Sequence, residues 1–175
     1  MMVINLFGGP GIGKSTLAAD IFVMYKKRGI YSEYIHEYAK DLIYEDRTKT
    51  FRNQFYIMSK QHHRLWKIVD YIRENKIDGY IVMDSPIILG LVYTQNRDNH
   101  FKHFEKFIVN EFKSMNNINI LLERDGEGYE ESGRNETFEQ ALEKDREVKD
   151  LLDKNDIEYI SLKRDRVIDY LKERL

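Results

Sequence analysis

Short apolar runs alternate with longer amphipathic segments along the chain. Mostly apolar runs lie at residues 3–7, 80–83, 118–122 and 157–162. Strands that are buried on both faces of a parallel sheet have this appearance. A more polar run at 30–36 suits a strand nearer the edge of the sheet. With helical patterns between the runs, the alternation predicts an α/β fold in which helices cover a parallel sheet.

Helical periodicity places two of the covering helices. The first begins within residues 13–16 and ends near Arg28, where Gly29 is a C-terminal stop signal. The second is a long helix in the middle of the chain, and its apolar positions are spaced by three and four residues. These positions are Phe51, Phe55, Met58, His62, Leu65, Val69 and Ile72. We therefore expect His62 to be a hydrogen-bonded histidine that faces the core.

Composition narrows the function classes. The 175 residues suit a single domain, and the absence of cysteine excludes disulfides, thiol nucleophiles and cysteine-ligated zinc. A net charge of -2 argues against a protein that coats nucleic acid, because such a protein is basic overall. Residues 47–73 are locally positive, however, with seven Lys and Arg against one acidic residue. The chain has no cationic leader and no long apolar run, so we expect a cytoplasmic protein that does not span a membrane.

The strongest motif is G-G-P-G-I-G-K-S at residues 8–15, which satisfies G-x-x-x-x-G-K-[ST] between an apolar strand and an amphipathic helix. Its glycines allow backbone N–H groups to surround a polyphosphate at a helix N-terminus. Lys14 is then expected to reach the β- and γ-phosphates, Ser15 to ligate magnesium and Thr16 to contact the α-phosphate. The expected ATP-binding residues are Gly8, Gly9, Gly11, Ile12, Gly13, Lys14, Ser15 and Thr16.

Asp84 follows the apolar run 80–83 and is the natural second magnesium residue beside Ser15. Hydrolytic motor ATPases usually carry a second acid directly after this position, whereas here Ser85 follows. An N-K-x-D sequence at 75–78 resembles a guanine-reading motif, but it precedes a strand instead of following one. These features argue against a motor ATPase and against a GTPase.

A glycine-rich segment after the run 118–122 predicts a short mobile lid at about 124–135. Arg124 at its base and Arg134 near its far end are expected to close over the phosphates and to stabilise charge on the transferring group. Asp145 lies close to the apolar stripe of the next helix, so its carboxylate needs a cationic partner. We expect that partner to be an arginine, with the lid as one source.

With these motifs, the chain resembles the P-loop nucleoside and nucleotide kinases. E-Y-A at 37–39, D-S-P at 84–86 and G-R-N-E-T at 133–137 are similar to segments of small kinases encoded by bacteriophages and of the ribosylnicotinamide kinase domain. The resemblance implies a three-layer fold with a five-stranded sheet of order 2-3-1-4-5, ATP as the donor, magnesium, and an acceptor cleft under the middle helix. Asp84-Ser85 departs from the acid–arginine pair common in such kinases.

The acceptor is left open by the sequence. A free hydroxyl needs a carboxylate to orient it, and Glu37 or Asp84 is placed for this role. A nucleoside monophosphate, which is slightly favoured, needs a cationic pocket, for which Arg47, Arg52, Lys60 and Arg64 are available. Gln54 and Tyr56 are candidates for reading or stacking on a base.

Two further alternatives remain open at this point. One is a kinase that acts on a hydroxyl in nucleic acid, with the basic segment 47–73 tracking the backbone. The other is an NTP-hydrolysing switch that transfers phosphate to no acceptor. The sequence leaves both a monomer and a homodimer open.

Overall fold

The computed structural model describes residues 1–94, 99–124 and 137–174. Its five strands form one parallel sheet of order β2-β3-β1-β4-β5, which confirms the expected topology. The strands are β1 (Met2–Phe7), β2 (Tyr31–Ile35), β3 (Gly79–Met83), β4 (Asn117–Glu123) and β5 (Ile160–Lys163). As its polar sequence suggested, β2 lies at an edge of the sheet.

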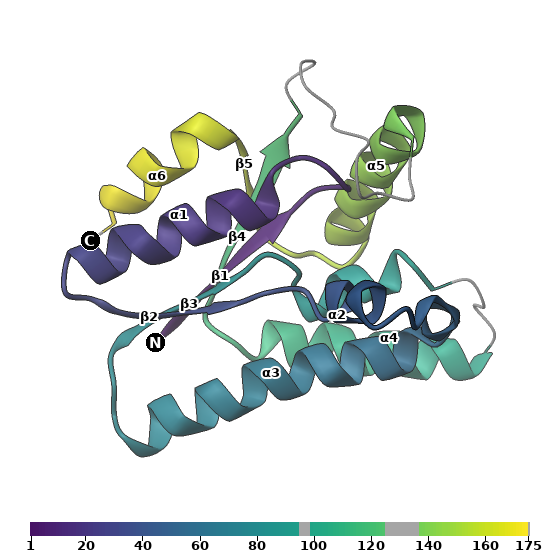
Figure 1. Cartoon of the computed structure of the whole chain (residues 1–175), viewed down its shortest axis with the longest axis horizontal. Helices are drawn as coiled ribbons and strands as arrows, with labels where there is room; N and C mark the ends of the chain where they lie inside the picture. Colours follow the sequence, from purple (N-terminus) through teal and green to yellow (C-terminus); the bar gives the residue numbers. More distant parts are fainter. Residues whose placement is uncertain (95–98, 125–136, 175) are drawn as a thin grey trace.

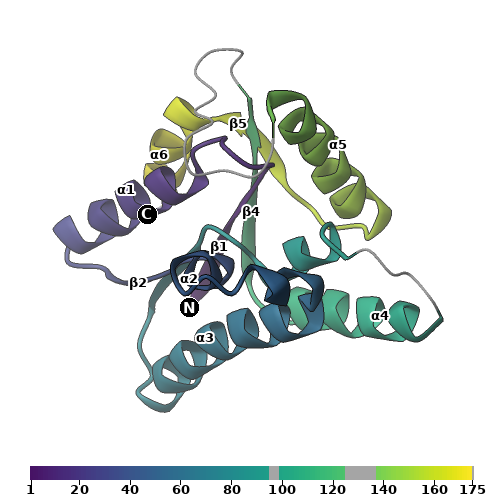
Figure 2. The same ribbon diagram turned by 45° about the vertical axis from the view of Figure 1, so that its right-hand side comes forward.

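Helices cover both faces of this sheet (Figures 1 and 2). On one face, α1 (Lys14–Lys27) and α6 (Arg164–Lys172) share a buried apolar cluster with β1 and β4. On the other face lie α3 (Gln54–Glu74), α4 (Asn99–Lys113) and α5 (Phe138–Lys154). The remaining elements are α2 (Ala39–Tyr44) and two short 3₁₀ helices, η1 (Thr48–Arg52) and η2 (Ile87–Leu91).

The first helix agrees with its sequence pattern. It buries Leu17, Ile21 and Tyr25, and it is followed by Gly29, whose φ of 71° lies in the left-handed region. The expected stripe of the middle helix is wrong at its start, however. Phe51 belongs to η1, and Phe55 is 62% exposed. For Phe51 the reason is that the Asn53 side chain accepts a hydrogen bond from the Tyr56 N–H, so that α3 begins after Phe51.

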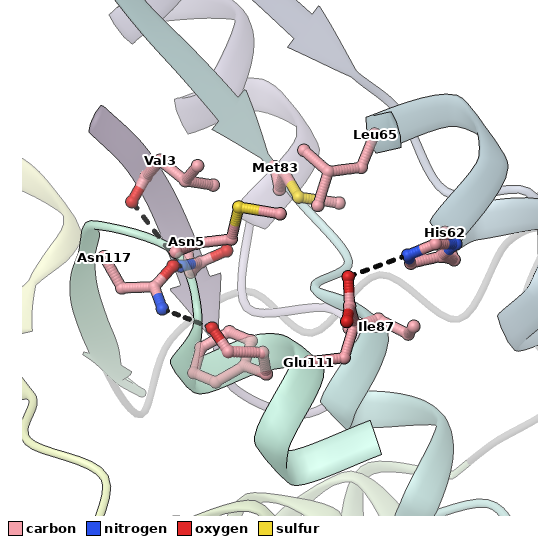
Figure 3. Close-up of a pocket in the computed structure, with 10 residues that line it drawn as sticks. Val3, Asn5, His62, Leu65, Met83, Ile87, Glu111 and Asn117 are labelled. Atoms are coloured by element: carbon pink, nitrogen blue, oxygen red, sulfur yellow. Dashed lines mark hydrogen bonds and ion pairs between the residues drawn. The ribbon is translucent and has the colours of Figure 1, made fainter. Parts of the chain in front are cut away.

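His62 is half-buried beside a small cavity between the sheet, α3 and α4 (Figure 3). Its Nε2 lies 3.1 Å from Glu111 Oε1, so the expected hydrogen-bonded histidine is confirmed. The cavity has a volume of about 10 Å³, which is room for one water molecule and no more. It is therefore a packing gap between helices and not a substrate site.

Within the described ranges, no helix combines the length and apolar character needed to cross a membrane.

Candidate active site

The phosphate loop connects β1 to the N-terminus of α1 and adopts the conformation that its glycines allow. Gly11 and Gly13 have φ values of 78° and 90°, which side chains with a Cβ atom rarely adopt. Lys14 Nζ donates hydrogen bonds to the backbone oxygens of Gly8 at 2.7 Å and Gly9 at 2.8 Å. The ammonium group is thus held over the loop, inside the space where phosphates are expected.

The electrostatics of Lys14 place two carboxylates near it. Burial lowers the pKa of Lys14 from its ordinary value, while the charges of Glu37 and Asp84 oppose that shift. Lys14, Glu37 and Asp84 follow β1, β2 and β3, three neighbouring strands of the sheet. The structure therefore brings together three of the five residues that the sequence suggested for the reacting centre, the others being Arg124 and Arg134.

The outer side of the loop is braced by an ion pair. Asp145 on α5 accepts a hydrogen bond from the Gly9 N–H at 2.6 Å and lies 2.6 Å from Arg124 Nε. Arg124 also donates to the backbone oxygen of Pro10 at 2.7 Å. A Cβ atom at Gly9 would meet Asp145 Oδ1 and the Ala141 oxygen at 2.7 Å, so only glycine fits this contact.

This brace confirms that Asp145 pairs with an arginine, and the arginine is the one at the base of the expected lid. In addition, Arg124 is not among the residues that line the cleft described below, and its catalytic role stays a prediction. The other lid arginine, Arg134, and nearly all of the lid expected at 124–135 lie outside the described residues.

Asp84 is the most buried acid near the loop, with 2% of its surface exposed. Its Oδ2 accepts a hydrogen bond from the Tyr34 hydroxyl at 2.8 Å and lies 3.9 Å from Lys40 Nζ. Lys40 in turn donates to Ser15 Oγ at 2.6 Å. Burial and the hydrogen bond to Asp84 raise the pKa of Tyr34, so the phenol stays protonated as a donor.

These side chains fit a magnesium ion. Asp84 Oδ1 is buried without a hydrogen-bond partner, and such an atom is costly unless a ligand satisfies it. No group of three or more His, Cys, Asp or Glu side chains in the described part of the chain forms a metal cage. Magnesium needs no such cage, since one carboxylate, one hydroxyl and substrate phosphates commonly suffice. Ser15 and Asp84 would hold it.

A single cleft of about 770 Å³ extends from the phosphate loop, a volume typical of small-molecule sites. Its lining includes Lys14, Ser15, Asp84 and Glu37 at the loop end. The far end is largely apolar and comes from α2, η1, α3 and η2. The residues of that end are Ile43, Phe51, Gln54, Ile57, Met58, Leu89 and, just after η2, Tyr93.

Other expected acceptor residues lie elsewhere. Arg52 and Tyr56 do not line the cleft. The Tyr56 hydroxyl lies 3.0 Å from the Tyr38 hydroxyl, and the Arg47 and Lys60 cations lie over the Tyr56 ring. Arg64, also expected in a cationic acceptor pocket, forms an ion pair with Asp41 on α2. Of the expected acceptor-binding residues, Glu37 and Gln54 are therefore the two in the cleft.

Three other residues of this site were not predicted from the sequence. Lys40 and Tyr34 contact Asp84, and Gln61 accepts the Tyr38 N–H at 2.8 Å. The same Gln61 donates to the His36 oxygen at 3.3 Å, so a buried amide fixes the backbone on both sides of Glu37. The signals that existed were a polar residue within an apolar helix stripe and a lysine three positions after Glu37.

A family model described as "AAA domain" matches residues 3–169 of the chain. The chain belongs to this family. The match contains the phosphate loop, Asp84 and the Arg124–Asp145 brace, so the whole candidate site lies within the AAA domain. No curated protein matches the chain in sequence.

Solved structures share the fold of this AAA domain. A NadR protein in complex with NR superposes with a TM-score of 0.70 and 17% identity, over 98% of this chain and 51% of that chain. Deoxyadenosine kinase from M. mycoides with bound dATP gives a TM-score of 0.54 and 21% identity, over 99% and 98%. The AAA domain spans about half the length of the NadR chains. The expected resemblance to P-loop nucleoside kinases is thereby confirmed at the level of the fold.

Proposed function

We propose that this protein is an ATP-dependent kinase that transfers the γ-phosphoryl group to a hydroxyl of a nucleoside-like acceptor. The observation that carries the proposal is the single cleft, which joins the phosphate loop to an apolar end across Glu37 and Asp84. Phosphoryl transfer needs two substrates held in line and positive charge on the moving group. A continuous cleft with Lys14 at its junction supplies that arrangement.

The chemistry divides between the two carboxylates. Asp84 is held by Tyr34 and has one unpaired buried oxygen, which suits a metal ligand. Bound magnesium supplies charge neutralisation at the β- and γ-phosphates. Glu37 lines the cleft where the acceptor hydroxyl would lie. In the transfer, the hydroxyl oxygen bonds to the γ-phosphorus, the bond from that phosphorus to the bridging oxygen breaks, ADP leaves, and the proton passes to Glu37.

The apolar end supports a nucleoside as the acceptor. Phe51 offers an aromatic surface for a base, and Gln54 offers an amide for its edge. The cations that a monophosphate acceptor would require at this end, Arg52 among them, do not line the described cleft. The deoxyadenosine kinase, which was also solved with dCMP and dCDP as products, is a fold neighbour that supports this acceptor class.

The test is transfer of label from γ-labelled ATP, with magnesium, to separate panels of nucleosides, nucleoside monophosphates, nicotinamide riboside and 5′-hydroxyl oligonucleotides. We expect a labelled nucleoside monophosphate. Label only on nucleoside monophosphates would show that the acceptor is a monophosphate, and label only on oligonucleotides would show that it is a nucleic acid. Release of free phosphate alone would show that the protein hydrolyses NTP and is not a kinase.

A matched pair of variants tests the proton acceptor. Glu37→Gln should lower kcat by about 100-fold or more and leave ATP affinity nearly unchanged, because a positioned base acts on the acceptor and not on the donor. Glu33→Gln, on the same edge strand but outside the cleft, is the control and should behave as the wild type. Equal kcat values for the two variants would remove Glu37 from this role.

A further inference from the structure

A lysine ammonium lies between the two side chains that fit magnesium. Lys40 Nζ donates to Ser15 Oγ at 2.6 Å and is 3.9 Å from Asp84 Oδ2. Lys40 belongs to α2 and not to the phosphate loop, and its side chain remains 38% exposed. The oxygens of Ser15 and Asp84 therefore already converge on a cation that the chain itself supplies.

We propose that the Lys40 ammonium takes the place of the metal when nucleotide is absent, so that a divalent cation enters this site only together with nucleotide phosphates and displaces Lys40 as it enters. The inference rests on the proposed function, because it assumes that Ser15 and Asp84 hold the metal of the kinase reaction.

The physical reason lies in the burial of Asp84. A carboxylate that is 2% exposed needs nearby positive charge, and Tyr34 supplies a hydrogen bond but no charge. Lys14 contributes charge, but its ammonium is held by the backbone oxygens of Gly8 and Gly9. Lys40 contributes charge on a flexible stem that is 38% exposed, so it is able to leave without disrupting the core.

Lys40 and a metal exclude one another at this position. Magnesium binds oxygen at about 2.0–2.1 Å. An ion held by both Ser15 Oγ and Asp84 would lie on the side of Ser15 that faces Asp84, where the Lys40 ammonium is 2.6 Å from Oγ. Like charges at that separation also repel. A metal without nucleotide gains only two protein ligands when it displaces Lys40. A metal that arrives with nucleotide gains phosphate oxygens as well, and those oxygens also attract the freed ammonium.

The experiment is titration of the full chain with Mn²⁺ in the absence of nucleotide, with free Mn²⁺ followed by its electron paramagnetic resonance signal. Lys40→Met keeps the aliphatic stem and removes the charge. It should bind Mn²⁺ about tenfold tighter than the wild type or better, on the scale by which one neighbouring charge shifts the binding of a proton. Lys67→Met, on an exposed position of α3, is the control and should match the wild type.

Mn²⁺ binding by Lys40→Met that is no tighter than that of the wild type would overturn the proposal. Lys40→Gln, which keeps a donor for Ser15 but no charge, provides a second variant and should also gain affinity, and thermal unfolding shows that each variant is folded. The titration uses no acceptor, so it separates the two proposals. If the wild type is a kinase but Lys40→Met binds Mn²⁺ no tighter than the wild type, the role of Lys40 is refuted and the kinase proposal stands. If Lys40→Met binds Mn²⁺ more tightly but the wild type transfers phosphate to no acceptor, the kinase proposal is refuted and the role of Lys40 stands.

Discussion

The brace between α5 and the phosphate loop yields a quantitative expectation for Asp145→Ala. The substitution removes the acceptor of the Gly9 N–H and leaves Arg124, whose side chain is 9% exposed, without its carboxylate. Breaking a buried ion pair typically costs about 3–5 kcal/mol. Asp145 is 21% exposed, and alanine gains some helix propensity, so about 2–4 kcal/mol of unfolding free energy should be lost.

The assay is thermal and urea unfolding of matched variants. For a chain of this length, each kcal/mol shifts Tm by about 2–4 °C, so Asp145→Ala should melt roughly 5–15 °C lower. Asp145→Asn keeps one acceptor oxygen and should fall between this variant and the wild type. Asp150→Ala on the exposed side of the same helix should change stability by less than about 0.5 kcal/mol.

A double-mutant cycle decides whether the pair acts as one unit. If Arg124 serves only to hold Asp145 and the loop, Arg124→Ala combined with Asp145→Ala should cost little more than the larger single change. Stability losses that simply add, or an Asp145→Ala variant as stable as Asp150→Ala, would refute the reasoning that the brace holds the loop.

Three further outcomes are expected from the same structure. Lys14→Ala should abolish most ATP turnover while Tm changes little, since the hydrogen bonds of its ammonium go to loop carbonyls. Near-normal turnover in a kinetic assay would contradict the assignment of the phosphate site. Burial raises the pKa of Tyr25, so above pH 10 the unfolded chain binds fewer protons than the folded one and stability falls. Tyr25→Phe should reduce the fall between pH 10 and 11, measured by urea unfolding, by about 1 kcal/mol, because the unfolded tyrosine is only partly ionised in that range. Met58→Ala should lower the free energy of unfolding by about 2–5 kcal/mol, whereas Phe55→Ser should lower it by less than about 1 kcal/mol. The reverse order in urea unfolding would indicate that Phe55 is buried, as the sequence pattern predicted.

The sheet and the loop were predictable because their signals are local. A strand buried on both faces reads as an apolar run wherever it lies, and a phosphate loop must place its glycines and lysine at fixed spacing. The partner of Asp145 was also predictable in kind, since a carboxylate beside an apolar stripe requires a cation. That the cation is Arg124 depends on how α5 meets the end of β4, which no local pattern encodes.

The wrong and missed predictions concern features that a residue pattern does not contain: where a helix is capped, which way a side chain points and which contacts folding creates. Periodicity continued through Phe51 and Phe55 because the pattern does not register that Asn53 caps the helix between them. The positive charge counted over 47–73 says nothing about which way each side chain points, and Arg52 lies away from the cleft. Lys40 was missed because a lysine in a short helix gains meaning only from the contacts that folding creates with Ser15 and Asp84.

Strand order explains why residues distant in sequence come together in the candidate site. Lys14, Glu37 and Asp84 each follow a strand, and those strands are neighbours in the order β2-β3-β1. Adjacent strands are about 4.8 Å apart, so side chains at three neighbouring carboxyl ends lie within about 10 Å of one another. Asp84 on the middle strand is then necessarily between the phosphate loop and Glu37. An acid in that position would face both substrates of a transfer reaction. An enzyme that only hydrolyses NTP needs no pocket for a second substrate, so the apolar end beyond Glu37 favours transfer over hydrolysis.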